Sequence, residues 1–426
     1  MINKWIYRTL SEQQIETQNK LAEELSINPV LAQLLVQRDI CSFDDARSFF
    51  RPDLANLHDP FLMADMDNAV KRLTKAMRHN EKILIYGDYD VDGTTSVALV
   101  YKFLKQFYSN VDFYIPDRYN EGYGISIQGI DFAAANDFKL VVALDCGIKA
   151  VEKVKYASSL GVDFIICDHH TPDAVLPPAV AVLDPKRDDC NYPYEHLSGC
   201  GVGFKLMQAF TIVNNIEFSQ LIPLMELLAL SIASDIVPIT GENRILAFYG
   251  LKQINSNPSI GLKSILDVCG LSDKEISISD IVFKIGPRIN ASGRMKLASE
   301  AVQLLVSSNP AFAKEKSDTI NEYNNDRKDL DKNITDEAIA LIASDVRFKQ
   351  RKSIVVHKPD WHKGVIGIVA SRLSEEYYKP SIVLTNSNGL ASGSARSVPG
   401  FDIYKAIDSC RDLLENFGGH MYAAGL

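Results

Sequence analysis

Several features that would assign this chain of 426 residues to a common class are missing from it. It has no apolar run long enough to span a bilayer, and its N-terminus, MINKWIYRTL, lacks the apolar core of a signal peptide. Its seven cysteines include no C-x-x-C pair, and their odd number argues against a disulfide framework. A basic coat is missing too, because the formal net charge is −9. We expect a cytoplasmic protein that could still act on nucleic acid through a local patch or bound cations.

Motifs of covalent and nucleotide-dependent catalysis are also missing. The sequence contains no G-x-S-x-G nucleophile elbow. It has neither a Walker A loop nor a G-x-G-x-x-G fingerprint in a strand–turn–helix setting. These absences direct attention to chemistry that needs no protein nucleophile.

Strand and helix patterns alternate from residue 65 to 255, which predicts a parallel sheet covered by helices. The expected strands are 82–86, 111–115, 140–144, 163–167 and 180–183. A polar helix is predicted over 309–346, with Pro310 in its first turn, as a solvated connector rather than a DNA-reading helix. From residue 350 onward, a strand, a loop, a helix and another strand predict a second, smaller domain.

These patterns predict an α/β protein of two domains with a cleft between them. The expected divisions are a helical lead-in over 1–58, a catalytic domain over 59–308, a connecting helix over 309–347 and a substrate-binding domain over 348–426. The lead-in is expected to be a packing appendage rather than a lid or a partner surface. The chain stops shortly after a Gly-rich loop, so we expect it to be a fragment of a longer protein.

Acidic residues and histidines directly follow three of the expected strands. They are Asp88, Asp90 and Asp92, then Asp145, then Asp168, His169 and His170. In open α/β sheets, ligands bind outside the carboxyl ends of the strands, so these side chains should meet in one place. Crowding like charges is costly unless cations neutralise them. A D-x-D pair alone would also fit an Asx-rich loop or a single calcium turn, but the whole set favours more than one divalent ion.

The types of ligand limit which metal ions and which class of reaction fit the site. Oxygen-rich ligands with an imidazole suit Mn²⁺ or Mg²⁺ better than zinc or copper. Two such ions a few ångströms apart stabilise the attacking and leaving oxygens of an in-line displacement at phosphorus. The predicted reaction class is metal-assisted hydrolysis of a phosphate ester or anhydride.

Four motifs in this order, GDYDVDGTTS, ALDCG, DHH and ASDIVP, resemble the DHH phosphoesterase superfamily. Five more stretches narrow the resemblance to the RecJ family of single-strand-specific 5′→3′ exonucleases: IPDRYNEGYG, KIGPRINASGRM, WHKGVIGIVASRL, GSARSVPGFD and GGHMYAAG. The resemblance runs from about residue 50 to 426. It implies a DHH catalytic domain and a smaller DHH-associated domain.

The resemblance also implies roles for individual residues. The implied ligands of two Mn²⁺ or Mg²⁺ ions are Asp90, Asp92, Asp145, His169 and Asp235, with Asp145 as the bridge. Asp88 and Asp168 would be supporting catalytic acids, and His170 would act beside the scissile phosphate as an acid or orienting group. Asp235, at a helix end, would otherwise have been interpreted as a cap. Tyr86 departs from the pattern, because several superfamily members carry His there; we expect one ion to be held less tightly, or to be completed by Asp88 or water.

Substrate contacts are implied in the same way. Phosphate contacts are expected from Arg118, Arg288, Ser394 and Arg396, with Arg294 and His420 as weaker candidates for the same groove. For any single arginine, a surface ion pair is the competing interpretation. Tyr119, Tyr123 and Trp361 could stack on bases, although core packing explains Trp361 at least as well.

We therefore expect a Mn²⁺- or Mg²⁺-dependent exonuclease that digests single-stranded DNA from the 5′ end to 5′-mononucleotides, in recombination and repair. The expected partners are single-stranded DNA, a single-strand-binding protein and a helicase, for a monomer without membrane contact. Two alternatives stay open: another superfamily enzyme, such as an oligoribonuclease or cyclic-dinucleotide phosphodiesterase, and a replication scaffold with an inactive DHH domain. Full-length family members continue into an OB-fold domain, none of which is present here, so we expect reduced strand affinity.

Overall fold

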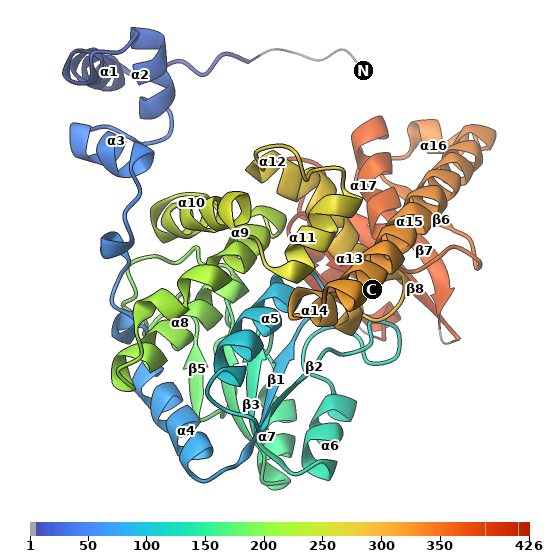
Figure 1. The fold of residues 1–426 in the computed structure, drawn as a ribbon. Coiled ribbons are helices and arrows are strands. Elements are labelled where there is room, and N and C mark those ends of the chain that lie inside the picture. The colour runs from blue at the N-terminus through green and yellow to red at the C-terminus, as the bar shows by residue number, and fades with distance from the viewer. Residues whose placement is uncertain (1–5, 388, 416) are drawn as a thin grey trace.

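The computed structural model describes residues 6–387, 389–415 and 417–426, with the side chains of Lys349 and His420 left out. Its N-terminal part is a group of three helices, α1 (Glu12–Leu25), α2 (Pro29–Val36) and α3 (Phe43–Phe50), standing apart from the rest of the molecule (Figure 1). These helices bury a small core of their own, which includes Leu21 and Ala32. One tie to the body is Arg244, whose Nε donates to the Phe49 carbonyl.

The first body is built on a five-stranded parallel sheet in the order β2-β1-β3-β4-β5. The strands are β1 (Lys82–Gly87), β2 (Val111–Tyr114), β3 (Phe138–Leu144), β4 (Asp163–Cys167) and β5 (Ala181–Leu183). All five predicted strands are present. Gly87 pairs with Leu144, and Leu144 pairs with Cys167, so the three residues that follow them emerge level with one another.

Helices cover both faces of this sheet because alternate strand residues point to opposite sides. Ile83 and Ile85 belong to the core beneath α5, α8 and α9, whereas Leu84 and Tyr86 belong to a second core beneath α6 and α7. The helices of this body are α4 (Met66–Arg78), α5 (Val91–Lys105), α6 (Ile127–Ala135), α7 (Val151–Ser159), α8 (Gly199–Val213), α9 (Met225–Ser234), α10 (Gly241–Ser256), α11 (Ile260–Val268), α12 (Ile278–Asp280), α13 (Gly286–Met295) and α14 (Ser299–Leu305). Single helical turns lie at Leu54–Asn56, Pro60–Leu62, Phe218–Gln220, Ile222–Leu224 and Ile281–Ile285.

A long helix, α15 (Pro310–Ser344), joins the first body to the second. Pro310 occupies its first turn as predicted, and Asn309 caps it by accepting from two backbone amides. The helix is more than a solvated connector, because Ile320 is buried in the core of the first body and Ile334 in that of the second.

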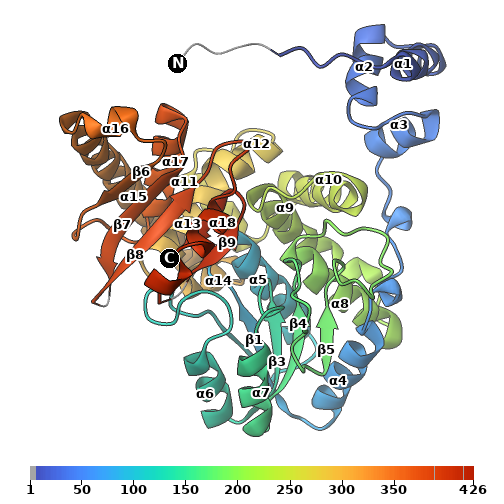
Figure 2. The same cartoon turned by 180° about the vertical axis from the view of Figure 1, so that it is seen from behind.

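The second body has a five-stranded sheet in the order β6-β7-β8-β10-β9, parallel only between β6 and β7. Its elements are α16 (Arg347–Gln350), β6 (Ile354–His357), α17 (Ile366–Tyr377), β7 (Ser381–Ser387), β8 (Leu390–Arg396), α18 (Ile403–Asp408), a turn at Arg411–Leu413, β9 (Gly418–His420) and β10 (Ala423–Gly425). Figure 2 shows this body beside α13 and α14. The predicted fold class is confirmed, and no described helix is both long and apolar enough to cross a bilayer.

Candidate metal centre

The carboxyl ends of β1, β3 and β4 bring the predicted acidic and histidine side chains together. Three sets of possible ligand atoms each lie within 4.8 Å of one another: Asp88, Asp90 and Asp145; Asp145, His169 and His170; and Asp92, His169 and Asp235. Asp145 and His169 each belong to two sets, so the sets merge into one continuous cluster. Such sharing is what two neighbouring ions with a common ligand require.

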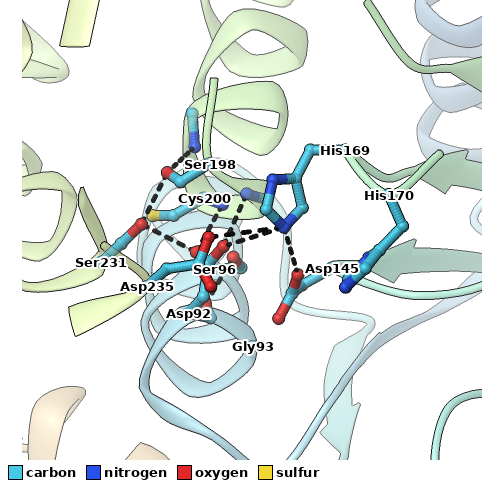
Figure 3. A network of polar contacts seen from close by, with 12 residues as sticks. Asp92, Gly93, Ser96, Asp145, His169, His170, Ser198, Cys200, Ser231 and Asp235 are labelled. Carbon is cyan, nitrogen blue, oxygen red and sulfur yellow. Dashed lines mark hydrogen bonds and ion pairs between the residues drawn. The ribbon is translucent and has the colours of Figure 1, made fainter. Parts of the chain in front are cut away.

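The imidazole of His169 lies at the centre of the cluster (Figure 3). Its Nε2 is 3.2 Å from Asp145 Oδ1, 3.6 Å from Asp235 Oδ2 and 3.7 Å from Asp92 Oδ2. Asp145 reaches this position through a left-handed backbone, with a φ of 58°. Residues in sparsely populated backbone regions cluster at functional sites, and an aspartate tolerates this one better than most.

The N-terminus of α8 holds the carboxylate of Asp92. The amides of Gly199 and Cys200 donate to its two oxygens at 2.7 and 2.9 Å, and Ser231 Oγ donates at 2.7 Å (Figure 3). An ionised carboxylate at a helix N-terminus is stabilised by these amides and by the helix dipole. A side chain at Gly199 would place its Cβ 2.6 Å from the Cβ of Asp145, so this glycine permits the close approach.

The turn after β1 is equally tight. Asp90 caps α5, its Oδ1 accepting from the amide of Gly93 at 3.0 Å. A Cβ on Gly93 would lie 2.4 Å from the carbonyl oxygen of Asp88. The two acids of the D-x-D pair are therefore held by backbone amides, Asp90 by the turn itself and Asp92 by α8.

Asp168 does not face the cluster as a free ligand. Its two oxygens accept from the amides of Ile148, His169 and His170, and its Oδ1 lies 2.7 Å from His170 Nδ1. Burial opposes ionisation of Asp168, but the His170 contact and these amides outweigh it and lower its pKa to about 2. The same contact overcomes the partial desolvation of the half-exposed His170 ring and raises its pKa to about 9. His170 is thus held as a cation, and its Nε2 lies 3.2 Å from the Tyr123 hydroxyl.

The electrostatics of the cluster suit divalent cations. Burial, followed by repulsion from neighbouring carboxylates, raises the pKa of Asp88, Asp90 and Asp145, and raises the pKa of Asp235 to about 8. Burial lowers the pKa of His169, which favours the neutral, metal-binding imidazole. Asp88 Oδ1 and Asp145 Oδ1 are buried and accept no hydrogen bond from the described residues. Cations would supply partners for these oxygens and remove the repulsion.

Tyr86 does not reach this cluster. Its ring stacks on Tyr114 at 5.5 Å, in the core beneath α6 and α7. Its hydroxyl donates to the Gly124 carbonyl at 3.0 Å and accepts from the Ser126 amide at 3.1 Å. Tyr86 therefore holds the loop after β2, while Asp88 lies within the cluster.

Cationic side chains gather between the metal cluster and the second body. Arg294 lies among Arg118, Arg327 and Arg396, and burial together with their repulsion lowers its pKa to about 10. Its Nη1 donates to the Gly364 carbonyl at 3.2 Å, which links α13 to the loop before α17. Such a concentration of half-buried positive charge is suited to an anionic ligand.

The predicted substrate residues fall into different surroundings. Arg396 Nη1 donates to Ser394 Oγ at 3.0 Å, so this pair lies together on β8, and Arg118 lies 4.8 Å from the centre of the Tyr89 ring. Arg288 instead donates to Asn321 Oδ1 at 2.9 Å and to the Lys284 carbonyl at 2.8 Å, within the helical layer. The side chain of His420 lies outside the described residues.

The aromatic candidates divide similarly. Trp361 is only 4% exposed and its Nε1 donates to Glu337 Oε2 at 2.9 Å, so it packs in the core of the second body. The Tyr119 hydroxyl donates to the Arg294 carbonyl. Tyr123 stays exposed beside His170.

Two cations were missed by the sequence reasoning, Lys186 beside the cluster and Arg327 beside Arg294. Lys186 follows β5 and donates to the His169 carbonyl, and the rule that residues after strands face the site would have found it. Arg327 lies within α15, where nothing in its local pattern distinguishes it from a solvated charge.

The order of the parallel sheet, the Asp-His cluster at its carboxyl edge and the second α/β body define a DHH-type phosphoesterase architecture. Residues 82–232 match the family model described as the DHH family, N-terminal domain, and residues 350–426 match the DHHA1 domain. The chain is 40% identical over 408 residues to the single-stranded-DNA-specific exonuclease RecJ of Bacillus subtilis, covering 95% of this chain and 51% of that one. It is 32% identical over 438 residues to RecJ of Escherichia coli, covering 97% and 75%.

Solved structures agree with these relatives. RecJ of Thermus thermophilus in complex with Mn²⁺ superimposes with a TM-score of 0.83 at 27% identity, covering 97% of this chain and 58% of that one. Another exonuclease RecJ, bound to manganese, gives a TM-score of 0.76 at 29% identity, covering 88% and 91%. This chain belongs to the RecJ family. It spans about half the length of the Bacillus subtilis relative.

Proposed function

We propose that this chain is the catalytic part of a Mn²⁺- or Mg²⁺-dependent exonuclease that digests single-stranded DNA from its 5′ end. The products would be 5′-mononucleotides, and the setting recombination and repair. The observation that carries the proposal is the continuous ligand cluster around Asp145 and His169, faced by the arginines near Arg294. Relatives named single-stranded-DNA-specific exonuclease, and RecJ structures that hold Mn²⁺ or Mg²⁺, support it.

The ligand assignment follows two of the three sets of nearby atoms, joined by Asp145, because His170 of the third set is held by Asp168 instead. One ion would be held by Asp90 and Asp145, with Asp88 in support, and the other by Asp92, His169 and Asp235, with Asp145 shared. Two bound ions supply an activated water and stabilise charge on the attacking and leaving oxygens. The protein's own residues then need only hold the phosphodiester in place.

His170 is the residue best suited to hold the scissile phosphate. Asp168 fixes its ring through Nδ1 and favours the cationic form, since their hydrogen bond raises the pKa of His170 to about 9. A fixed imidazolium can donate to a non-bridging oxygen or protonate a leaving oxygen. Asp168 acts through His170 and is a positioning residue in this assignment.

The 5′→3′ direction follows from the place of a terminal phosphate. Ser394 and Arg396 lie beside the start of α17, where a Cβ on Gly367 would be 2.9 Å from Ser394 Oγ and 3.1 Å from Arg396 Nη2. A terminal phosphate carries more charge than a diester, so a guanidinium, a hydroxyl and nearby amides should prefer it. Arg294, between this pair and the cluster, would bind the strand on the way to the metal ions.

The proposal extends to organisation and partners. The division at 1–58, 59–308, 309–347 and 348–426 assigns catalysis to the first body and end recognition to the second. A cytoplasmic monomer that cooperates with a single-strand-binding protein and a helicase would fit a nuclease limited to unpaired strands.

Digestion of one DNA oligonucleotide labelled at either its 5′ or its 3′ end, with Mn²⁺, tests the proposal. We expect the 5′ label to appear as a mononucleotide at once, while the 3′-labelled strand shortens gradually and blunt duplex resists. Faster cleavage of dinucleotides than of long strands would favour an oligoribonuclease-like or cyclic-dinucleotide enzyme instead. Stoichiometric Mn²⁺ binding without any hydrolysis would favour a scaffold.

A further inference from the structure

An exposed isoleucine next to the metal cluster has an unfavourable backbone conformation. Ile236 directly follows Asp235 at the end of α9, its φ is 60° and its side chain is 82% exposed. Among the described non-glycine residues with positive φ, it is the only β-branched one. Helices that end in this conformation normally place glycine or asparagine there, because a Cβ is disfavoured and a branched one more so.

Neither packing nor local preference explains this residue. A side chain this exposed gains almost nothing from burial, and a glycine would remove the backbone strain. Residues with a strained backbone of this kind occur mainly at functional sites, where the side chain has a role in binding or catalysis. Ile236 lies one residue from a proposed metal ligand, which indicates that its apolar side chain contacts a bound ligand beside the cluster.

Lys186 is a second, independent feature of the same side. Its ammonium group donates to the carbonyl of His169. The ring of that same His169 lies 3.6 Å from Asp235 Oδ2, so Lys186 is held by a residue that contacts this carboxylate. The described part of the chain gives Lys186 no ion pair, so its charge is available to an anion near Asp235.

The cluster therefore has cationic groups on two sides. Arg294 follows Gly293, which packs against the carbonyl of Tyr89 next to Asp90, whereas Lys186 is held by His169, whose ring lies 3.6 Å from Asp235. A strand whose 5′-phosphate is bound near Arg396 and whose first phosphodiester lies over the cluster must continue beyond it. The side of Asp235 is where the rest of that strand would pass.

We propose that Ile236 and Lys186 form a binding subsite for the nucleotide on the 3′ side of the scissile bond. Ile236 contacts the face of its base, and Lys186 contacts the phosphate that follows. The subsite rests on the proposed exonuclease function and adds to it a preference for strands over dinucleotides. It also explains an exposed apolar side chain in a strained conformation, since stacking on a base removes apolar surface from water.

The test of Ile236 combines a variant with a modified strand. Ile236→Asn keeps a residue that tolerates positive φ and removes the apolar branches; Ile236→Val keeps them. On an unmodified strand, we expect Ile236→Asn to raise KM about three- to tenfold, as loss of one apolar contact implies, with kcat changed less, and Ile236→Val to stay near wild type. On a strand with an abasic second nucleotide, wild type should show the same rise in KM, and Ile236→Asn should show no further rise.

A control places the abasic nucleotide farther along the strand. There the effects of the variant and of the lesion should multiply, because they act at different places. For Ile236→Asn, Mn²⁺ titration should match wild type and the midpoint of thermal unfolding should be unchanged or higher, because asparagine relieves the strain at positive φ; both results separate a lost contact from a displaced Asp235.

Lys186 is tested by the same logic with a neutral methylphosphonate after the second nucleotide. We expect Lys186→Gln to raise KM on the unmodified strand, to leave KM unchanged on the modified one, and to reduce the slope of log KM against log salt by about 0.7. An unchanged Mn²⁺ affinity would exclude an indirect effect through His169.

Two outcomes separate this inference from the proposed function. If wild type digests single strands but both variants lose the same factor on modified and unmodified strands, the subsite is wrong and the exonuclease stands. If wild type does not digest single strands at all, the proposed function fails, and the subsite fails with it.

Discussion

The amide of Gly199 donates to Asp92 Oδ2 at 2.7 Å across 107 positions of sequence. This contact joins the start of α8 to the turn after β1, and the same glycine packs against Asp145 at the end of β3. Two proposed ligands from different strands are therefore set by one residue with no side chain. The precision of the cluster depends on this packing as much as on the ligands themselves.

Replacing Asp145 by Asn should abolish hydrolysis and leave the fold intact. Asparagine tolerates the positive φ of this residue, so the variant removes charge without adding strain. Because Asp145 belongs to two ligand sets, both ions should be affected, and we expect a loss of more than about a hundredfold in initial rate with Mn²⁺. Circular dichroism provides the folding control. Turnover near that of wild type would exclude a bridging role.

Removal of metal ions by chelation should abolish hydrolysis of DNA, and added metal should restore it. The cluster combines carboxylates with the imidazole of His169, so Mn²⁺ should restore digestion at least as well as Mg²⁺, which prefers oxygen ligands and retained water. The measurement is initial rate after EDTA treatment and dialysis, across a titration of each ion. Full activity in exhaustively chelated protein would contradict a metal mechanism.

Replacing Arg396 by Ala should weaken recognition of the 5′ end. A charge-assisted contact to phosphate is worth roughly 1.5–3 kcal/mol, so KM on a 5′-phosphorylated strand should rise about ten- to a hundredfold. The preference for 5′-phosphate over 5′-hydroxyl should decrease while Mn²⁺ stays bound. The measurement is the initial rate on a 5′-phosphorylated and on a 5′-hydroxyl strand, for wild type and variant.

Arg288 offers the matched control for that experiment. Its guanidinium is engaged by Asn321 and by the Lys284 carbonyl, so Arg288→Ala should reduce the midpoint of thermal unfolding and leave the 5′-phosphate preference unchanged. If Arg396→Ala keeps the full preference for 5′-phosphate, the terminal phosphate is bound elsewhere, with Arg294 and Arg118 as the next candidates.

Replacing Gly199 by Ala should lower activity although no ligand is changed. The added Cβ would lie 2.6 Å from the Cβ and 2.8 Å from the Cα of Asp145, so either Asp145 or α8 must shift. Because small displacements of catalytic groups are costly, we expect a loss of about a hundredfold in kcat with reduced Mn²⁺ affinity. Gly201→Ala, whose Cβ meets the flexible Leu197 side chain at 3.3 Å, should be much milder. Equal effects of the two substitutions would show that α8 tolerates the shift.

Much of the site could be predicted from local sequence for a simple reason. Short continuous apolar runs, followed by acids and glycines, identify the ends of buried strands, and strand ends of a parallel sheet converge at one edge. Asp90, Asp145 and His169 all follow such runs, so the local pattern is enough to indicate them. Asp235 follows a helix, so only the family resemblance distinguished it from a cap.

The sequence by itself determined the five strands of the first sheet, the long helix from Pro310 and the residue types available for metal binding, because these depend on neighbours along the chain. Only the tertiary structure decided that Tyr86 faces the core on the other side of the sheet. It also decided that Arg288 donates to Asn321 within the helical layer and that the Gly199 amide donates to Asp92. It also brought Lys186 and Ile236 to the edge of the cluster. These relationships depend on which face of a strand a side chain takes and on contacts between distant segments, and both are settled by packing of the whole chain.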